Sequence, residues 1–465
     1  MSSIEVHRQH YNVTFALLAV AAVAFSLLQS LVAPALLTIQ HDLHTNTAGA
    51  AWILSAYLLS ASVMTPIAGR LGDMFGKKRM LVVTLAIVAA GTLVAALATS
   101  IDVLILGRVI QGAGGAIFPL AFAIIRDEFP RERVPTGIAL ISALLGVGGG
   151  LGIVLAGPIT QHLSYHWLFW LPLVPVVAAG VAAQVVIPES PIRAPGRVDW
   201  AGATLLTAWL VTLLVGVSEG PTWGWGSARV LGLFAISAVL VVLWVRAEDL
   251  IEAPLVDMRM MRLHAVWTTN LTGLLLGFGM YSSFVLIPEF VELPASGGVG
   301  FGSSVTQAGI FLLPATLGML LVGPLSGRLA RSVGAKVPLV AGCFLTAASY
   351  TFVAAAHDAR WEIYVCTSLM GAGIGFAFGA MANLIVAAVR AEETGVATGM
   401  NTIVRTIGGS LGSQISASVV AASTDSAYTT AFAIAAAAVT VSFLVSFSVP
   451  GRARLLSPAL VRSPS

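Results

Sequence analysis

One dense cluster of charged and glycine residues separates two segments that are apolar enough to sit in lipid. This cluster is GRLGDMFGKKR, residues 69–79. Its basic residues could simply mark one side of a membrane, whereas its glycines allow a tight turn and close backbone approach. Asp73, amid basic neighbours, could cap the N-terminus of a nearby helix or hold an ion pair. A second candidate interaction is an Arg79–Asp127 ion pair across the same surface, which would break when parts of the molecule move.

Arg108 interrupts a long apolar run, LILGRVIQGAGGAIFPLAFAII. An arginine at the centre of a membrane helix costs at least ~2.5 kcal/mol, so it should face a cavity and a partner and not lipid. Gln111, Gly112, Gly115 and Pro119 follow at helical spacing and form one polar, small-residue face beside the guanidinium. The alternative is a structural arginine that bonds to backbone carbonyls.

Arg405, beside Asn401, is a second arginine in an apolar run and allows the same two interpretations. Carboxylates are scarcer than arginines inside the apolar runs: no run carries Asp or Glu near its middle. The stretch FVLIPEFVEL places Glu289 and Glu292 three residues apart near the end of a run. Partly desolvated carboxyls there could exchange protons with the outside. The alternative is a pair of solvated acids at the rim of the membrane.

The composition indicates an integral membrane protein. Hydrophobic residues make up 57% of the 465 positions and charged residues only 10%, whereas soluble domains carry about a quarter charged residues. The net charge of +3 does not indicate nucleic-acid binding, because most basic residues lie in the segments between the apolar runs and in the tails. Cys343 and Cys366 fall in apolar runs, and the histidines lie in loops or at the ends of runs, so we expect no metal site. The glycine-rich stretches do not complete a dinucleotide motif, so we expect no cofactor.

Fourteen runs approach the length of about 20 apolar residues that crosses a bilayer. They lie near residues 13–39, 51–69, 80–98, 103–125, 136–160, 167–188, 200–217, 228–246, 265–289, 306–327, 337–356, 361–389, 396–422 and 427–449. With the N-terminus in the cytoplasm, twenty of the 24 lysines and arginines fall on the inner side, in agreement with the positive-inside rule. We therefore expect a multi-pass protein of the inner (plasma) membrane with both termini cytoplasmic.

The chain contains an internal repeat. PIAGRLGDMFGKKRMLV from Pro66 aligns with PLSGRLARSVGAKVPLV from Pro324 at an offset of 258, and GGGLG from Gly148 aligns with GGSLG from Gly408 at an offset of 260. Parallel repeats of this kind are a transporter architecture, with the substrate site between the halves near mid-membrane. The predicted organisation is an all-α membrane fold with two pseudo-symmetric six-helix bundles and two inserted helices. Its expected parts are an N-terminal tail 1–12, a bundle 13–190, a linker with two inserted helices 191–262, a bundle 263–450 and a C-terminal tail 451–465.

The charged loop resembles the signature loop between the second and third helices of the major facilitator superfamily. Fourteen helices in a 6 + 2 + 6 plan resemble its drug:proton antiporter branch, and the likeness covers nearly the whole chain. The resemblance implies an inner gate made of Gly69, Arg70, Asp73, Gly76, Arg79 and Asp127, with Asp127 as the partner. It also implies a proton-coupling role for Arg108.

The fifth run, GVGGGLGIVLAGPIT, resembles the antiporter motif of the family's fifth helix. The matching small residues are Gly148, Gly152 and Gly157, with Ala156 between them, and their spacing lets another helix approach closely. The proline that follows the second glycine in the motif is replaced here by Ile153, and Pro158 comes later. Any bend is therefore expected to shift by about one helical turn.

The expected substrate cavity has apolar, aromatic and amide walls: Gln29, Tyr57, Gln111, Tyr281, Phe284, Asn401 and Arg405. Such walls suit lipophilic or amphiphilic compounds better than sugars or phosphates. We expect a monomeric secondary transporter that exports drug-like compounds by proton antiport through alternating access, with the substrate, protons and the bilayer as its partners. The alternatives are an exporter of a lipid or endogenous metabolite with weak or no proton coupling, and a receptor or scaffold that transports nothing. No enzyme motif is present, so we expect neither an enzyme nor catalytic residues.

Overall fold

The computed structural model describes residues 11–45, 47–190, 199–252, 254–294, 299–421 and 424–451. Most of the two predicted tails and the first part of the predicted linker lie outside the described residues. The same is true of six of the basic residues assigned to the inner side: Arg8, Arg193, Arg197, Arg452, Arg454 and Arg462.

The first half of the chain is a bundle of long helices, two of which are interrupted. The first is split into α1 (Tyr11–Ser30), η1 (Ala33–Ala35) and α2 (Leu36–Asp42), and the fourth into α5 (Ile101–Gln111), η2 (Gly112–Ala116) and α6 (Ile117–Glu128). The uninterrupted helices are α3 (Thr47–Phe75), α4 (Lys77–Ala96), α7 (Val134–His162) and α8 (Trp167–Val186).

The second half repeats this plan after a helical pair. The pair is α9 (Trp200–Trp223) and α10 (Ala228–Leu250), followed by the single turn α11 (Met258–Met261). The long helices of the second half are α12 (His264–Glu292), α13 (Val305–Ser332), α14 (Lys336–Ala355), α15 (Arg360–Ala388), α16 (Thr394–Val420, after η4, Ala391–Glu393) and α17 (Asp425–Ser446). The described residues contain no strand, so the predicted all-α class and helix plan are confirmed.

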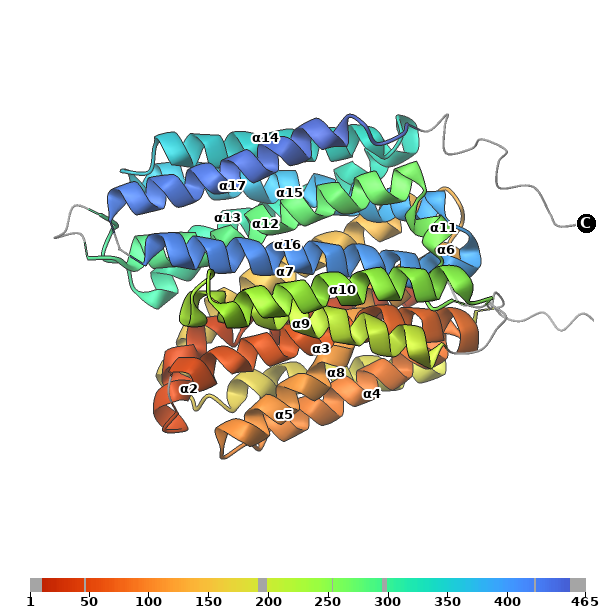
Figure 1. The fold of residues 1–465 in the computed structure, drawn as a ribbon, viewed down its shortest axis with the longest axis horizontal. Helices are drawn as coiled ribbons and strands as arrows, with labels where there is room; N and C mark the ends of the chain where they lie inside the picture. Colours follow the sequence, from red (N-terminus) through yellow and green to blue (C-terminus); the bar gives the residue numbers. More distant parts are fainter. Residues whose placement is uncertain are drawn as a thin grey trace, which may run out of the picture.

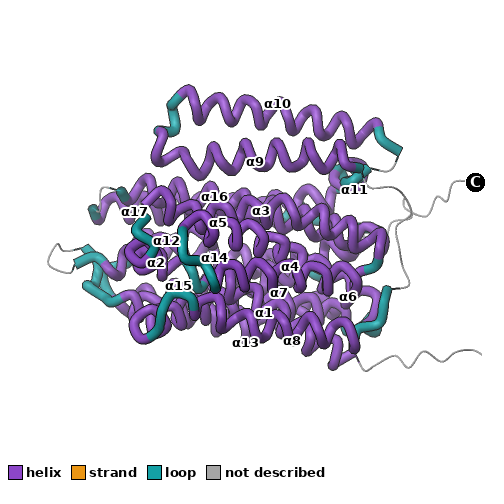
Figure 2. Tube along the Cα trace, turned by 90° about the horizontal axis from the view of Figure 1, so that it is seen from below, coloured by secondary structure: helices purple, strands orange, loops and turns teal. Residues whose placement is uncertain are grey.

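The two halves lie side by side with their helices roughly parallel, and the inserted pair covers the seam (Figure 1). Helix α7 packs along α13, and α3 packs along α16, so each half contributes to both long seams. Figure 2 shows α9 and α10 as a separate layer on one side, where α9 packs against α3 and α16. Helices α3 and α6 end, and α16 begins, at the end of the bundle where α6 and α11 are labelled on the right in Figure 1. We call it the Asp73 end, because Asp73 lies in the last turn of α3.

Thirteen segments of the described chain are long and apolar enough to cross a membrane, and α16 is the fourteenth long helix. Helix α16 is 27 residues long but contains many glycine, serine and threonine residues as well as Arg405. It packs against helices of both halves and against α9, so little of it needs to face lipid. Its polar composition therefore follows from its place in the bundle.

The break at Gly112–Ala116 lies where neighbouring helices pack closely against the fourth helix. A Cβ at Gly112 would lie 2.5 Å from the Ser60 side chain, and a Cβ at Gly114 would clash with the Phe25 ring. Glycine at these positions lets α3 and α1 approach the fourth helix at backbone distance. The sequence predicts an unbroken helix here, and the structure replaces its centre with a tighter turn.

Candidate functional site

Asp73 links the two halves at one end of the bundle. It lies in the last turn of α3 and is fully buried. Its carboxylate accepts hydrogen bonds from the backbone N–H groups of Gly395 and Val396 at 3.2 and 3.0 Å. These residues open α16, whose free N–H groups and positive dipole end favour a negative charge. Of the two roles that the sequence leaves open, Asp73 takes the helix cap.

Arg126, near the end of α6, strengthens the same junction. Its guanidinium donates to three oxygen atoms just before α16 and at its start: the carbonyls of Val389 and Arg390 at 3.0 and 3.1 Å and the Thr394 hydroxyl at 2.6 Å. In the sequence, Arg126 is only one of the basic residues on the inner side, and nothing in its neighbourhood indicates that it reaches the other half. We call Asp73 and Arg126, with the segment 389–396 that they contact, the latch.

The latch requires close approach of two backbones. A Cβ at Gly69 would lie 2.6 Å from the Gly395 carbonyl oxygen, closer than real Cβ atoms come. The amide of Asn383 adds a further bond across the halves, donating to the Pro135 carbonyl at 3.0 Å. The halves are therefore in tight contact at the Asp73 end.

The predicted Arg79–Asp127 ion pair is wrong. Lys77 Nζ lies 2.5 Å from Asp127 Oδ2 with both side chains buried, whereas the Arg79 side chain is exposed. Arg79 is two residues further along α4 and so points about 200° around the helix from Lys77. Lys77 opens α4 and Asp127 lies near the end of α6. This pair therefore joins two helices of the first half and does not cross to the second.

Glu189 holds the start of α4 in place. Its carboxylate accepts hydrogen bonds from the backbone N–H groups of Lys78 and Arg79, both at 3.2 Å. Gly76 precedes them with a φ of 116°, and a Cβ there would meet the Glu189 carboxylate. Arg70 is partly buried on α3, one turn before Asp73.

Arg108 is fully buried and is bonded mainly to backbone. Its Nε donates to the Ile53 carbonyl at 3.2 Å, and its Nη1 donates to the Leu28 carbonyl at 3.1 Å and to Gln111 Oε1 at 2.8 Å. The guanidinium carbon lies 4.2 Å from the centre of the Tyr57 ring. Nη2 is buried with no hydrogen-bond partner among the described residues. These contacts fit the alternative of a structural arginine that bonds to backbone carbonyls, except that Nη2 has no described partner.

The expected cavity residues lie in three neighbouring sets. Tyr57 and Gln111 are buried with Arg108, and Gln29 donates across the halves to the Tyr281 hydroxyl at 3.1 Å. Phe284 packs against Tyr281 with ring centres 5.9 Å apart.

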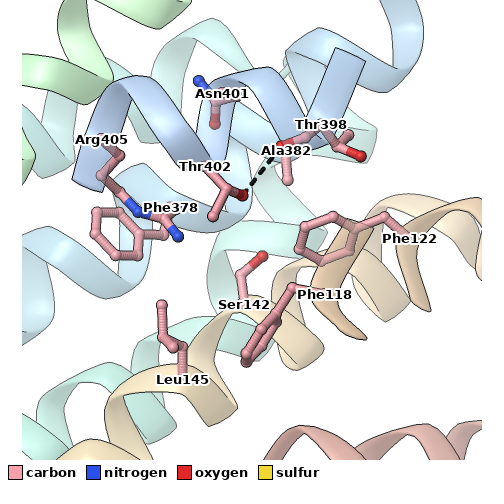
Figure 3. A pocket seen from close by; sticks show the side chains of 10 residues that line it. All are labelled: Phe118, Phe122, Ser142, Leu145, Phe378, Ala382, Thr398, Asn401, Thr402 and Arg405. Atoms are coloured by element: carbon pink, nitrogen blue, oxygen red, sulfur yellow. Dashed lines mark hydrogen bonds between the residues drawn. The ribbon is translucent and has the colours of Figure 1, made fainter. Parts of the chain in front are cut away.

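Asn401 and Arg405 line a pocket between the halves (Figure 3), and Arg405 lies one helical turn from Gly409, where the Tyr281 ring packs on α16. The pocket walls come from α6, α7, α15 and α16: Phe118, Phe122, Ser142, Leu145, Phe378, Ala382, Thr398, Asn401, Thr402 and Arg405. Arg405 and Leu145 each lie eleven residues from the end of their helix that is at the Asp73 end, which is ~16 Å and thus near mid-bundle. The space has room for about one water molecule, so the halves are closed over it.

Glu289 and Glu292 are exposed at the far end of α12. Neither lines the pocket, and neither contacts Arg108 or Arg405 through a described ion pair. Their assignment to proton coupling stays a prediction.

The glycines of α7 serve two neighbours. A Cβ at Gly148 would lie 2.5 Å from the Ser26 side chain, and a Cβ at Gly152 would clash with the Ser30 hydroxyl, both on α1. A Cβ at Gly157 would lie 2.7 Å from the Thr306 hydroxyl of α13, in the other half. Pro158 is accommodated within α7, which continues to His162. The small residues thus allow close packing within the first half and across the seam.

Comparison with known proteins gives the family. The model of the Major Facilitator Superfamily matches residues 18–413. The chain is 30% identical over 389 residues to the tetracenomycin C resistance and export protein of Streptomyces glaucescens, covering 83% of this chain and 71% of that protein. It is 31% identical over 280 residues to multidrug resistance protein 3 of Bacillus subtilis, covering 60% of this chain and 53% of that protein.

The fold of the chain also resembles a solved structure. The human organic anion transporter MFSD10 (TETRAN) superposes with a TM-score of 0.64 at 16% identity, covering 94% of this chain and 98% of that one. The long apolar helices make the protein a multi-pass membrane protein, and the family makes it a transporter and not an enzyme. This chain belongs to the major facilitator superfamily, and similar proteins in it are named for drug resistance and export.

Proposed function

We propose that this protein exports lipophilic or amphiphilic drug-like compounds across the plasma membrane by alternating access, coupled to proton antiport. In this proposal the Asp73 end faces the cytoplasm, as the distribution of basic residues in the sequence favours. Relatives named for export of tetracenomycin C and for multidrug resistance support a drug-like cargo.

The single observation that carries the proposal is the latch. Asp73 and Arg126 of the first half bond to the start of α16 in the second half, while a pocket lined by both halves lies at mid-bundle. Alternating access requires contacts of this kind, because they must form when the cytoplasmic side closes and break when it opens. A receptor or scaffold that transports nothing would not need a contact between the halves that forms and breaks.

Proton antiport needs a group that gains and loses a proton during the cycle. The candidates are Glu289 and Glu292, and the family resemblance adds Arg108 as a third residue for proton coupling. Asp73 is a further candidate, because protonation would remove the charge that holds α16.

One observation favours the alternative of an exporter with weak or no proton coupling. Among the described residues, no carboxylate lines the pocket, and none forms an ion pair with Arg108 or Arg405. A lipid or endogenous metabolite could then leave down its own electrochemical gradient.

The test uses purified protein in liposomes with an imposed pH gradient and a lipophilic fluorescent dye. Wild type is compared with Arg108→Ala and Glu289→Gln, and with Asp102→Asn, an exposed acid in the first turn of α5, as the matched control. We expect gradient-driven dye movement in wild type and in the control, and its loss in the first two variants.

Dye movement that persists in Glu289→Gln would remove that residue from proton coupling. Dye movement that requires the protein but does not change with the pH gradient would support the alternative of an exporter without proton coupling. The proposal of export fails if wild type moves no dye under a pH gradient or a membrane potential and no dye binds to it.

A further inference from the structure

The mid-bundle pocket is built from repeat-related positions. Eight of its ten lining residues form four pairs, each 260 positions apart: Phe118 with Phe378, Phe122 with Ala382, Ser142 with Thr402, and Leu145 with Arg405. The same offset relates GGGLG to GGSLG in the two halves. The pocket therefore lies where equivalent faces of the halves meet.

The Leu145–Arg405 pair differs in charge, whereas the other three pairs carry no charge. Phe118 and Phe378 are identical in type, and Ser142 and Thr402 both carry a hydroxyl group, but Arg405 faces the pocket where the other half has Leu145. Figure 3 shows the Arg405 guanidinium beside the Phe378 ring on one side of the space. The guanidinium carbon lies 4.4 Å from the centre of that ring.

Arg405 has no anionic partner in the part of the chain that the structure describes. Its side chain takes part in no described ion pair or hydrogen bond, and no acidic residue lines the pocket. Arg108, by contrast, bonds to two backbone carbonyls and to Gln111. A cation held in a low-dielectric interior attracts an anion strongly, because little water screens it. Arg405, half-buried at mid-bundle, is thus a cation that is left available to a cargo.

The rest of the pocket selects the shape of that cargo. The rings of Phe118, Phe122 and Phe378 offer aromatic faces, and aromatic rings stack on such faces and on guanidinium planes. A guanidinium also binds a carboxylate or a phenolate through short charge-assisted hydrogen bonds. Asn401 and Thr402 add polar groups on the same helix as Arg405.

We infer that the preferred cargo is a planar aromatic compound with an acidic group, which Arg405 binds while Phe118 and Phe378 hold the ring system. The inference rests on the proposed export function and narrows it. It predicts that lipophilic cations are poor substrates. It also provides a driving force without an interior acid, since a membrane potential of 100 mV, negative inside, favours export of a monovalent anion by about fiftyfold.

The test compares two dyes that share a xanthene ring system, the anion fluorescein and the cation rhodamine 123. Their transport by reconstituted full-length protein is measured at a fixed membrane potential, and their binding is measured by fluorescence anisotropy in detergent. The variants are Arg405→Gln, Arg405→Lys and, as a matched control, Arg360→Gln. Arg360 is also an arginine over a phenylalanine ring, 5.7 Å from the centre of Phe301, but it is exposed.

We expect wild type to transport fluorescein at least tenfold faster than rhodamine 123. Arg405→Gln should lower fluorescein transport and binding at least tenfold, since one charge-assisted contact contributes about tenfold or more, and should leave rhodamine unchanged or faster. Arg405→Lys should keep part of the fluorescein transport, and Arg360→Gln should keep all of it. If Arg405→Gln does not fold, Leu145→Glu tests the same point, because it neutralises the pocket from the repeat-related position.

Two results would overturn the inference while leaving the proposed function in place. One is faster movement of rhodamine than of fluorescein, and the other is an equal loss of both dyes in Arg405→Gln, which would indicate a packing role. Failure of wild type to move or bind either dye would overturn the proposed function and the inference together.

Discussion

Neutralising Asp73 is the most direct way to weaken the latch. The carboxylate accepts two backbone hydrogen bonds from the start of α16 at 3.2 and 3.0 Å and is fully buried. Hydrogen bonds to a charged group contribute ~1.5–3 kcal/mol each, and a negative charge at a helix N-terminus adds up to ~2 kcal/mol. An asparagine side chain would keep an acceptor oxygen but lose the charge. The substitution Asp73→Asn should therefore cost the closed state about 2 kcal/mol, which raises the open-to-closed ratio about thirtyfold.

The assay is a spin-label distance measurement across the halves at the Asp73 end. Labels at Arg131, between α6 and α7, and at Val333, just after α13, are both on exposed positions. We expect Asp73→Asn to add a longer-distance population that wild type lacks. Arg126→Gln should act in the same direction, because it removes the bonds from the guanidinium.

The control is Asp102→Asn, which removes an exposed carboxylate at the other end of the bundle and should leave the distances unchanged. If the distances in Asp73→Asn and Arg126→Gln match those of wild type, these contacts do not hold the halves together and the reasoning is refuted.

Further predictions concern glycine packing and the buried ion pair. Gly69→Ala should open the Asp73 end, because its Cβ would lie 2.6 Å from a backbone oxygen of α16, whereas Gly232→Ala, with nothing within 4 Å, should not; the same label pair reports both. Lys77→Gln should lower the thermal unfolding midpoint, since it removes the cationic partner of the buried Asp127 and leaves, among the described residues, only the Ser190 hydroxyl bonded to that carboxylate, and breaking a buried pair costs roughly 3–5 kcal/mol. Arg79→Gln, at an exposed position, should leave the midpoint unchanged. Equal midpoints for Lys77→Gln and Arg79→Gln would contradict the assigned pairing.

The helix plan and the repeat could be predicted because they depend on local composition and on constant offsets. Long apolar runs give the spans, and even α16 is recognisable despite its polar residues. The interruption at Gly112–Ala116 was harder to predict, because its glycines allow close approach of α3 and α1 but do not by themselves show that the helix changes its geometry.

The partners of charged residues could be predicted only in part. The composition around Asp73 leaves both a helix cap and an ion pair open. Its observed partner, Gly395, is 322 positions away, and local sequence carries no information on that contact. The adjacent Lys77, Lys78 and Arg79 look equivalent in the sequence, and only the orientation of α4 decides that Lys77 faces Asp127. Arg126 was missed for the same reason.

Some of the pocket residues could have been predicted from the internal repeat. The pairs 260 residues apart are visible in the sequence once the register is known. Which of those pairs meet at mid-bundle depends on the packing of α6, α7, α15 and α16. The contact of Tyr57 and Gln111 with Arg108, and the place of Asn401 and Arg405 in the pocket, likewise required the structure.

Alternating access requires that the two ends of the bundle open in turn, which paired distance measurements at both ends can show. The Asp73 end is followed with labels at Arg131 and Val333, and the opposite end with labels at His162 and Asp358, all exposed. On addition of a transported dye, alternating access predicts that one distance lengthens while the other shortens. Distances that lengthen together, or that stay fixed at both ends while dye is transported, would contradict the account.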